Sequence, residues 1–376
     1  MGAKETITQI AATAGITING DNPWDIKVHN EKLYRRVLSE GSLGLGEAYM
    51  DGWWDCERLD QFFCRIISEG MDRKMGFNFE LIKQLAKAKL LNMQSRSRAK
   101  TVIDRHYDLS PELYMGFLGP YNQYTSLYFS GCETLELAEE KKLRLICEKL
   151  NLQSQDRVLD IGCGWGGFAK FAAERFGCSV VGVSISEEQI RYAREFCKGL
   201  PVEIIYLDYR DLSGKFPGYF DKVLVCGMIE HVGHKNHGRL MREVSNCIND
   251  EEWSLFLLDT IGANKSKVTV DPWINRYIFP GGIAPSIKQL GEAAEDLFIM
   301  EDLHSFGPSY DKTLMAWHDR FVSNWDNVKH MYGERFYRMF EYYLLSCAGG
   351  FRARIAQQWQ IVFSKRGYPG GYEAVR

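Results

Sequence analysis

The chain has 376 residues, of which 45% are hydrophobic and 25% charged, so it can bury a sizeable core, and its length favours two domains. A formal net charge of −3 argues against a dedicated nucleic-acid-binding protein. No apolar run reaches the roughly 18 residues of a membrane span, and the N-terminus lacks a signal-peptide pattern, so a cytoplasmic protein is expected. The ten cysteines include no C-x-x-C pair, so neither a metal site nor a disulfide framework is predicted.

Residues 1–80 are predicted to form a small, mostly helical N-terminal domain. Apolar spacing predicts helices at 7–14 and 31–40, and a short strand is expected at 16–18. The stretch 41–55 is rich in glycine and aromatic residues, and we interpret it as a packed turn that buries Trp53 and Trp54.

Residues 81–100 carry six Lys and Arg and no acidic residue, interleaved with apolar side chains. Such a basic amphipathic segment can lie on an anionic membrane surface, or it can be a solvated linker helix. Both interpretations stay open, and either places a domain boundary here.

Residues 101–376 show strands alternating with helices, which predicts a doubly wound parallel α/β sheet. The expected strands are 157–161, 178–184, 202–207, 220–226 and 253–258, and the expected helices include 134–150, 168–175 and 187–197. Ligands of such sheets bind at the carboxyl ends of the strands, so residues that follow each strand are the candidates for a site.

The first of these strand ends carries Val158-Leu-Asp-Ile-Gly-Cys-Gly-Trp-Gly-Gly167. Glycines allow positive φ and let a ligand approach the backbone closely. Asp160 would repel a pyrophosphate but attract a cationic amino group, so the motif D-x-G-x-G-x-G resembles motif I of S-adenosylmethionine-dependent methyltransferases. Gly162 and Gly164 would then line the methionine end of the cofactor.

The later strand ends add further polar side chains. Ser184 and Gln189 follow the second strand, where a ribose would lie, and Asp208 and Tyr209 follow the third, beside an adenine. The last two strands are followed by two carboxylates, Glu230 and Asp259. Two nearby carboxylates raise each other's proton affinity, so one of them is a candidate acid or base.

Several of these motifs together resemble the cyclopropane-fatty-acyl-phospholipid synthase family, in its bacterial phospholipid type, along nearly the whole chain. The similar segments are His106-Tyr-Asp108, Gln123-Tyr-Thr-Ser126, motif I, Gly227-Met-Ile-Glu-His-Val-Gly233, 270–282, Phe306-Gly-Pro-Ser-Tyr-Asp311, 347–354 and the N-terminal 41–54. The resemblance implies a class I methyltransferase fold, Rossmann-like, with a smaller mostly helical N-terminal domain.

The resemblance also implies the reaction and the partners. These enzymes add the methyl carbon of S-adenosylmethionine to a cis double bond of an acyl chain in a membrane phospholipid, and bound bicarbonate removes a proton so that a cyclopropane closes. A homodimer and peripheral contact with the inner face of the membrane are expected. The predicted cofactor-binding residues are Tyr124, Thr125, Asp160, Gly162, Gly164, Trp165, Ser184, Gln189, Asp208 and Tyr209.

The bicarbonate site of the family carries over with two departures. Glu230, Ile261 and Tyr310 match, but Ser126 stands where the family has Cys, and Asp259 stands where it has His. A serine hydroxyl can still donate to the anion. A carboxylate repels it unless protonated, so Asp259 is either neutral and a donor, or it replaces bicarbonate as the base.

Two other functions stay open because of these departures. One is a C-methyltransferase that makes methyl-branched or methylene chains, and the other is a non-catalytic paralogue that binds cofactor or lipid. The acyl-chain and head-group preferences are not readable from the sequence.

Overall fold

The computed structural model describes residues 2–70 and 109–376, so the predicted basic segment at 81–100 and the motif His106-Tyr-Asp108 lie outside the described residues. The chain forms two compact units. The first comprises Met1–Met93, Val268–Gly281 and Tyr310–Ala356, and the second comprises Gln94–Lys267, Gly282–Ser309 and Gln357–Arg376. This grouping differs from the predicted domains, because two later segments belong with the N-terminal helices.

The second unit is built on a seven-stranded sheet in the order β5-β4-β3-β6-β7-β9-β8. The strands are β3 (Arg157–Ile161), β4 (Ser179–Ser184), β5 (Val202–Tyr206), β6 (Lys222–Cys226), β7 (Leu255–Ala263), β8 (Ile299–Ser305) and β9 (Ala356–Ser364). Strands β3 to β7 pair in parallel, and their β-branched, apolar sequences are typical of strands buried on both faces. The predicted doubly wound α/β fold is confirmed.

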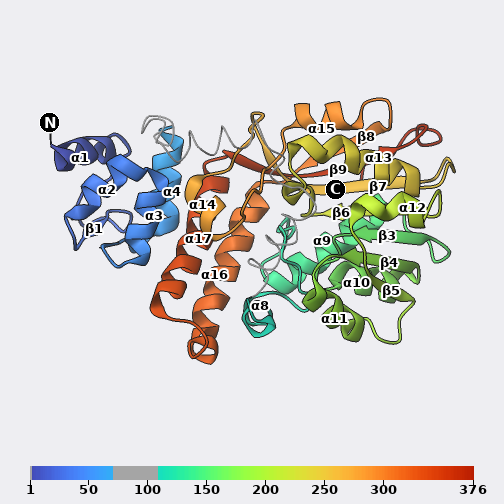
Figure 1. Cartoon of the computed structure of the whole chain (residues 1–376), viewed down its shortest axis with the longest axis horizontal. Helices are drawn as coiled ribbons and strands as arrows, with labels where there is room; N and C mark the ends of the chain where they lie inside the picture. The colour runs from blue at the N-terminus through green and yellow to red at the C-terminus, as the bar shows by residue number, and fades with distance from the viewer. Residues whose placement is uncertain (1, 71–108) are drawn as a thin grey trace. The chain divides into compact units, whose positions relative to one another are not determined.

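Helices cover both faces of this sheet (Figure 1). One face packs against α9 (Leu135–Lys149), α10 (Gly167–Phe176) and α11 (Glu187–Phe196), and the other against α12 (Leu212–Lys215), α13 (His237–Cys247) and α15 (Ile287–Ala294). Alternate strand residues therefore enter two separate cores, as in Val158 and Leu159 of β3. The unit also contains α8 (Pro111–Phe117) and the short turns η1 (Tyr209–Asp211), η2 (Ile229–His231) and η3 (His234–Asn236).

The far side of the sheet was not foreseen from the sequence. Strands β8 and β9 pair antiparallel, so the sheet is mixed, and β9 lies between β7 and β8. Strand β7 also runs to Ala263 rather than ending at 258, so Asp259 lies inside a strand and not after its end. The expectation that Asp259 follows the strand is wrong, because pairing continues past Cys226 of β6 into the loop that follows.

The first unit is mostly helical. Its elements are α1 (Ala3–Thr13), β1 (Lys27–Val28), α2 (Lys32–Glu40), α3 (Ser42–Met50), β2 (Trp54–Asp55), α4 (Leu59–Ser68), α14 (Pro272–Tyr277), α16 (Pro308–Val328) and α17 (Glu334–Arg352). The two predicted helices are present as α1 and α2. The strand expected at 16–18 is only an isolated bridge between Ile18 and Ile26.

The glycine-rich stretch 41–55 is a helix followed by a short strand, not the predicted packed turn. Its glycines serve helix packing: a Cβ on Gly44 would lie 2.6 Å from the carbonyl oxygen of Arg36, and a Cβ on Gly46 would overlap the indole of Trp273. Trp54 is fully buried as expected, but Trp53 is only partly so. The sequence pattern predicts a turn because glycine is common in turns. In the structure, these glycines instead allow two helices to approach closely.

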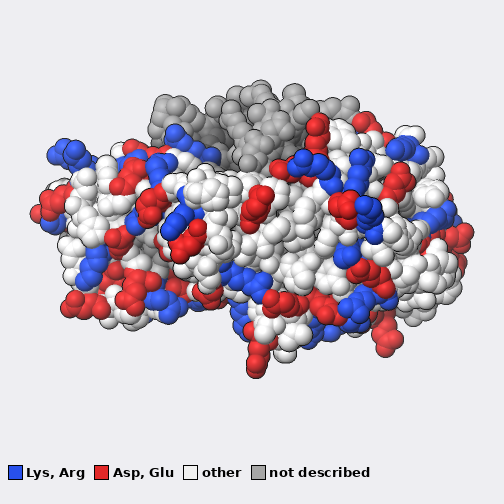
Figure 2. All heavy atoms as spheres, turned by 90° about the horizontal axis from the view of Figure 1, so that it is seen from below, with Lys and Arg blue, Asp and Glu red and all other residues white. Residues whose placement is uncertain are grey.

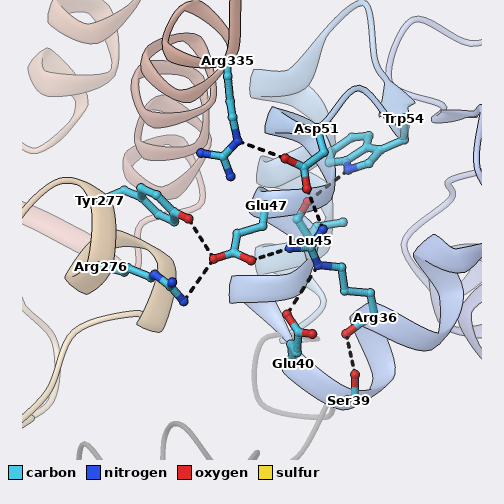
Figure 3. Close-up of polar contacts among 10 residues, drawn as sticks. All are labelled: Arg36, Ser39, Glu40, Leu45, Glu47, Asp51, Trp54, Arg276, Tyr277 and Arg335. Atoms are coloured by element: carbon cyan, nitrogen blue, oxygen red, sulfur yellow. Dashed lines mark hydrogen bonds and ion pairs between the residues drawn. The ribbon is translucent and has the colours of Figure 1, made fainter.

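A polar network centred on Glu47 joins four helices of the first unit (Figure 3). The Glu47 carboxylate accepts from the Arg36 guanidinium and from the Tyr277 hydroxyl at 2.8 Å, and it pairs with Arg276 at 3.2 Å. Asp51 receives a second bond from Arg36, at 2.8 Å, and one from Arg335 of α17 at 3.0 Å. These contacts tie α2 and α3 to α14 and α17.

The charged surface is mixed in sign. On the face in Figure 2, acidic and basic side chains of the described parts are interspersed, as the small net charge suggests. Within residues 2–70 and 109–376, the helices are too short or too polar to cross a bilayer.

Candidate functional site

The glycine loop after β3 has the geometry that motif I requires. Gly162, Gly164 and Gly166 all have positive φ, at 82°, 53° and 84°. A Cβ on Gly162 would lie 2.8 Å from Cγ of Met228, whereas a Cβ on Gly164 would meet nothing within 4 Å. Gly164 therefore faces open space, where a ligand can approach the backbone.

Asp160 lies at the end of β3 and is 2% exposed. Burial raises the pKa of its carboxyl to about 7, and the nearby Lys142 ammonium opposes this shift. A cationic ligand group placed beside Asp160 would favour the ionised form further, which suits the amino group of a methionine moiety.

Two predicted cofactor residues meet at one aromatic ring. Tyr124 contacts Tyr114 of α8 with ring centroids 5.2 Å apart, and Trp165 of the glycine loop contacts the same ring at 5.6 Å. The indole N–H of Trp165 is buried, with no hydrogen-bond partner among the described residues. The structure thus brings the loop 119–126 beside motif I.

Thr125 and Ser126 follow in that loop. The Thr125 hydroxyl accepts from the ammonium of Lys142 at 2.8 Å, and its methyl fills the space that a Cβ on Gly227 would need. Ser126 is 1% exposed, and its hydroxyl donates to the carbonyl of Leu127 at 3.1 Å. Thr125 therefore lies at the end of β6, close to the turn that carries Glu230.

The residues predicted to meet the nucleoside form two local pairs. The Ser184 hydroxyl lies 3.4 Å from Oε1 of Gln189 and accepts from the backbone N–H of Ser186. The Asp208 carboxylate is already bonded to Arg210 at 2.7 Å, and Arg210 also lies over the ring of Tyr209. Both pairs follow the strands as predicted.

Glu230 is the most unusual carboxyl group of the site. It is 8% exposed; Oε1 accepts from the backbone N–H of Ile261 at 2.7 Å, and Oε2 is buried without a partner among the described residues. Burial raises the pKa of Glu230 to about 7, and Asp259 adds to that shift while bonds from Ile261 and Thr260 oppose it. The structure therefore joins two predicted residues, Glu230 and Ile261, and leaves one buried oxygen available to a ligand.

Asp259 is fully buried and differently engaged. Its two carboxylate oxygens accept from the side-chain amides of Gln358 and Gln360 on β9, the latter at 2.8 Å. Burial raises the pKa of Asp259 above its ordinary value, although Lys142, Gln360 and Lys149 oppose that shift. The carboxyl group is thus bonded by two amides of its own unit.

Tyr310 belongs to the first unit. It is 7% exposed and packs against Phe351 and Trp317, with ring centroids 4.5 and 6.2 Å away. Next to it, Asp311 receives two bonds from Arg352, both at 2.9 Å, which fix the first turn of α16.

The buried charged side chains of α9 and the buried amides of β9 were not predicted from the sequence. Glu139, Lys142 and Lys149 are all fully buried, although the helix reads as an ordinary charged surface helix. A weak signal exists for the amides, because Gln357, Gln358 and Gln360 stand among apolar residues that predict a buried strand.

Comparisons with known proteins show the family of this chain. The model of the family described as mycolic acid cyclopropane synthetase matches residues 94–361. The cyclopropane-fatty-acyl-phospholipid synthase of Escherichia coli strain K12 is 48% identical over 368 residues, which cover 98% of this chain and 94% of that protein. Sphingolipid C9-methyltransferase A of Emericella nidulans is 34% identical over 291 residues, 73% of this chain and 55% of that protein.

The chain is also similar to solved structures of this family. The mycolic acid cyclopropane synthase CmaA1, crystallised with SAH and CTAB, superposes with a TM-score of 0.64 at 26% identity, covering 70% of this chain and 97% of that chain.

Proposed function

Because this chain belongs to the mycolic acid cyclopropane synthetase family and is an S-adenosylmethionine-dependent methyltransferase, we propose that it cyclopropanates unsaturated acyl chains of membrane phospholipids. The observation that carries the proposal is the 48% identity, over 98% of the chain, with a cyclopropane-fatty-acyl-phospholipid synthase. S-Adenosylmethionine, when bound, supplies an electrophilic methyl group, which the weakly nucleophilic alkene attacks.

The residues at the ends of β3 and β4 fit this cofactor. Gly164 leaves open space above the glycine loop, and Asp160 offers a buried carboxylate to the amino group. Tyr124 and Trp165 would form an apolar wall that keeps water from the sulfonium. Polar and aromatic side chains after the later strands and in the loop before motif I would bind the rest of S-adenosylmethionine: Thr125, Ser184, Gln189, Asp208 and Tyr209.

Glu230 would hold the base that removes a proton before the ring closes. Bicarbonate would supply a small base, and Glu230, whose buried Oε2 has no partner among the described residues, would hold it. With a pKa of about 7, Glu230 can accept a hydrogen bond from the hydroxyl of that ion when ionised. The backbone N–H of Ile261 fixes Glu230 at 2.7 Å. The family resemblance implies that Ser126 and Tyr310 also bind the ion.

Asp259 would serve as a fixed counter-charge and not as the base. Its oxygens accept two amide bonds inside the sheet. Burial raises the pKa of Asp259, and the nearby Lys142 and Lys149 oppose that shift. A carboxylate held in this way offers bicarbonate no hydrogen-bond donor, so the ion would depend on the other side chains.

A second function is a C-methyltransferase that leaves a methyl branch or a methylene group on the acyl chain. Ser126 and Asp259 favour it, because both change the site that removes the proton. The 34% identity with a sphingolipid C9-methyltransferase also favours it.

The cellular setting belongs to the same proposal. We propose that the enzyme acts as a homodimer in the cytoplasm, at the inner face of the membrane. The basic segment at 81–100 would contact anionic lipid, so reversing the charge of Lys83, Lys87 and Lys89 should weaken vesicle binding. Unchanged binding would argue against this contact.

The test is mass spectrometry of unsaturated phospholipid vesicles incubated with the chain and methyl-labelled S-adenosylmethionine, with and without added bicarbonate. A bicarbonate-dependent cyclopropane supports the proposal. A branched or methylene product supports the second function. Cofactor binding without any lipid product would overturn both and leave a non-catalytic paralogue.

A further inference from the structure

Helix α9 directs two buried charges at the loop that carries the predicted cofactor residues. Glu139 and Lys142 are one helical turn apart, and both are fully buried. Burying a charged group is costly unless it is paired and hydrogen-bonded. Their partners therefore indicate what these side chains are for.

Glu139 holds the backbone of the loop. Its Oε2 accepts from the N–H of Tyr121 and its Oε1 from the N–H of Gln123, both at 3.0 Å. These N–H groups belong to an irregular segment without a strand or helix ladder, so the carboxylate takes the place of that ladder.

Lys142 holds the side chains of the same loop. Its ammonium donates to Oε1 of Gln123 at 3.1 Å, to the Thr125 hydroxyl at 2.8 Å and to the Cys226 sulfur at 3.1 Å. Burial would lower the pKa of Lys142, but Cys226 and Asp259 outweigh this effect, so its pKa is raised and the side chain is charged at neutral pH. One cation thus bonds the loop to the end of β6.

Two glycines allow the loop to pack closely against its neighbours. A side chain on Gly167, at the start of α10, would overlap the carbonyl of Tyr121, and one on Gly227 would overlap Thr125. The loop is therefore fitted closely to both motif I and the β6 end, with the two charges of α9 behind it.

We propose that Glu139 and Lys142 are positioning residues that hold the loop 121–126 so that Tyr124 and Thr125 complete the cofactor site. This inference rests on the proposed function, in which these two loop residues bind S-adenosylmethionine. Neither charge touches the reacting atoms; each acts through the loop.

The experiment is isothermal titration of the full chain with S-adenosylhomocysteine, which needs no lipid turnover. We expect Lys142→Met and Glu139→Gln to raise the Kd at least tenfold. The matched control is Lys149→Met, which removes a second fully buried lysine of the same helix, bonded to His304 and not to the loop. We expect it to change the Kd less than threefold.

A second variant tests the inference in case Lys142→Met does not fold. Gln123→Met keeps the length of the side chain, removes one acceptor of Lys142 from the loop itself, and should raise the Kd about threefold or more. In turnover assays, Lys142→Met should raise the KM for S-adenosylmethionine but not the KM for lipid.

The outcomes separate this inference from the proposed function. If the parent chain binds S-adenosylhomocysteine and folded Lys142→Met binds it equally well, the inference is wrong and the proposed function stands. If Lys149→Met weakens binding as much as Lys142→Met, the effect is general destabilisation and the positioning role is refuted. A parent chain that binds no S-adenosylhomocysteine overturns the proposed function, and this inference with it.

Discussion

Replacing the buried Glu230 by glutamine should make the chain more stable at high pH. The pKa of Glu230 is raised from 4.5 to about 7, chiefly by burial. Between these values the folded chain keeps a proton that the unfolded chain releases, so the free energy of unfolding falls as pH rises. Glutamine is nearly isosteric and does not ionise, so the free energy of unfolding of the variant should not fall with pH for this reason.

The magnitude follows from the two pKa values. One pKa unit corresponds to about 1.4 kcal/mol, so a shift of this size should cost the parent about 2–3 kcal/mol between pH 5 and pH 8. Other carboxyl groups titrate in both proteins, and their contributions largely cancel in the difference. The stability of Glu230→Gln relative to the parent should therefore rise by that amount over the same range.

The assay is urea unfolding, followed by tryptophan fluorescence at pH 5, 6.5 and 8, with Glu292→Gln as the control. Glu292 is exposed and pairs with the exposed Lys288, so its substitution should change stability by less than about 0.5 kcal/mol at every pH. If the difference between Glu230→Gln and the parent is the same at pH 5 and pH 8, Glu230 does not titrate near neutrality and the role assigned to it is wrong.

Three further substitutions test other parts of the structure. Asp259→Asn should lower the free energy of unfolding by about 1–3 kcal/mol, because one of the two buried amides of Gln358 and Gln360 loses its acceptor; Asp250→Asn, at an exposed ion pair, is the control, and equal stability of both variants would contradict the buried network. Gly46→Ala should cost about 1–3 kcal/mol in thermal or urea unfolding, since the new methyl overlaps Trp273, and an unaffected midpoint would refute that contact. Asp160→Asn should weaken S-adenosylhomocysteine binding about tenfold by calorimetry, and unchanged affinity would remove Asp160 from the cofactor site.

The glycine loop and the strand and helix around it could be predicted from the sequence because their signals are local. A short apolar strand, three glycines and a helix follow one another at 157–176, and each needs only its neighbours to be recognised. The same holds for Glu230, which follows a strand and a positive-φ glycine, Gly227. The family resemblance added that the chain is an S-adenosylmethionine-dependent methyltransferase.

The parts that could not be predicted depend on distant contacts. Whether Lys142 is buried depends on Thr125 and Cys226, which are far from it in sequence. The environment of Asp259 likewise depends on β9, whose glutamines lie about 100 residues later. The prediction of a packed turn at 41–55 was wrong for a related reason. Gly46 must be glycine because a side chain there would overlap Trp273, and that contact is known only from the structure.

The place of β9 in the sheet has a consequence for synthesis on the ribosome. It comes last among the described strands, yet it lies between β7 and β8, and its amides bond the carboxylate of Asp259. Until about residue 360 has emerged, β7 presents an open apolar edge and a carboxylate without its amides. Prematurely terminated chains should therefore be recognised as unfinished by chaperones and proteases, while full-length chains hide this edge in one late step.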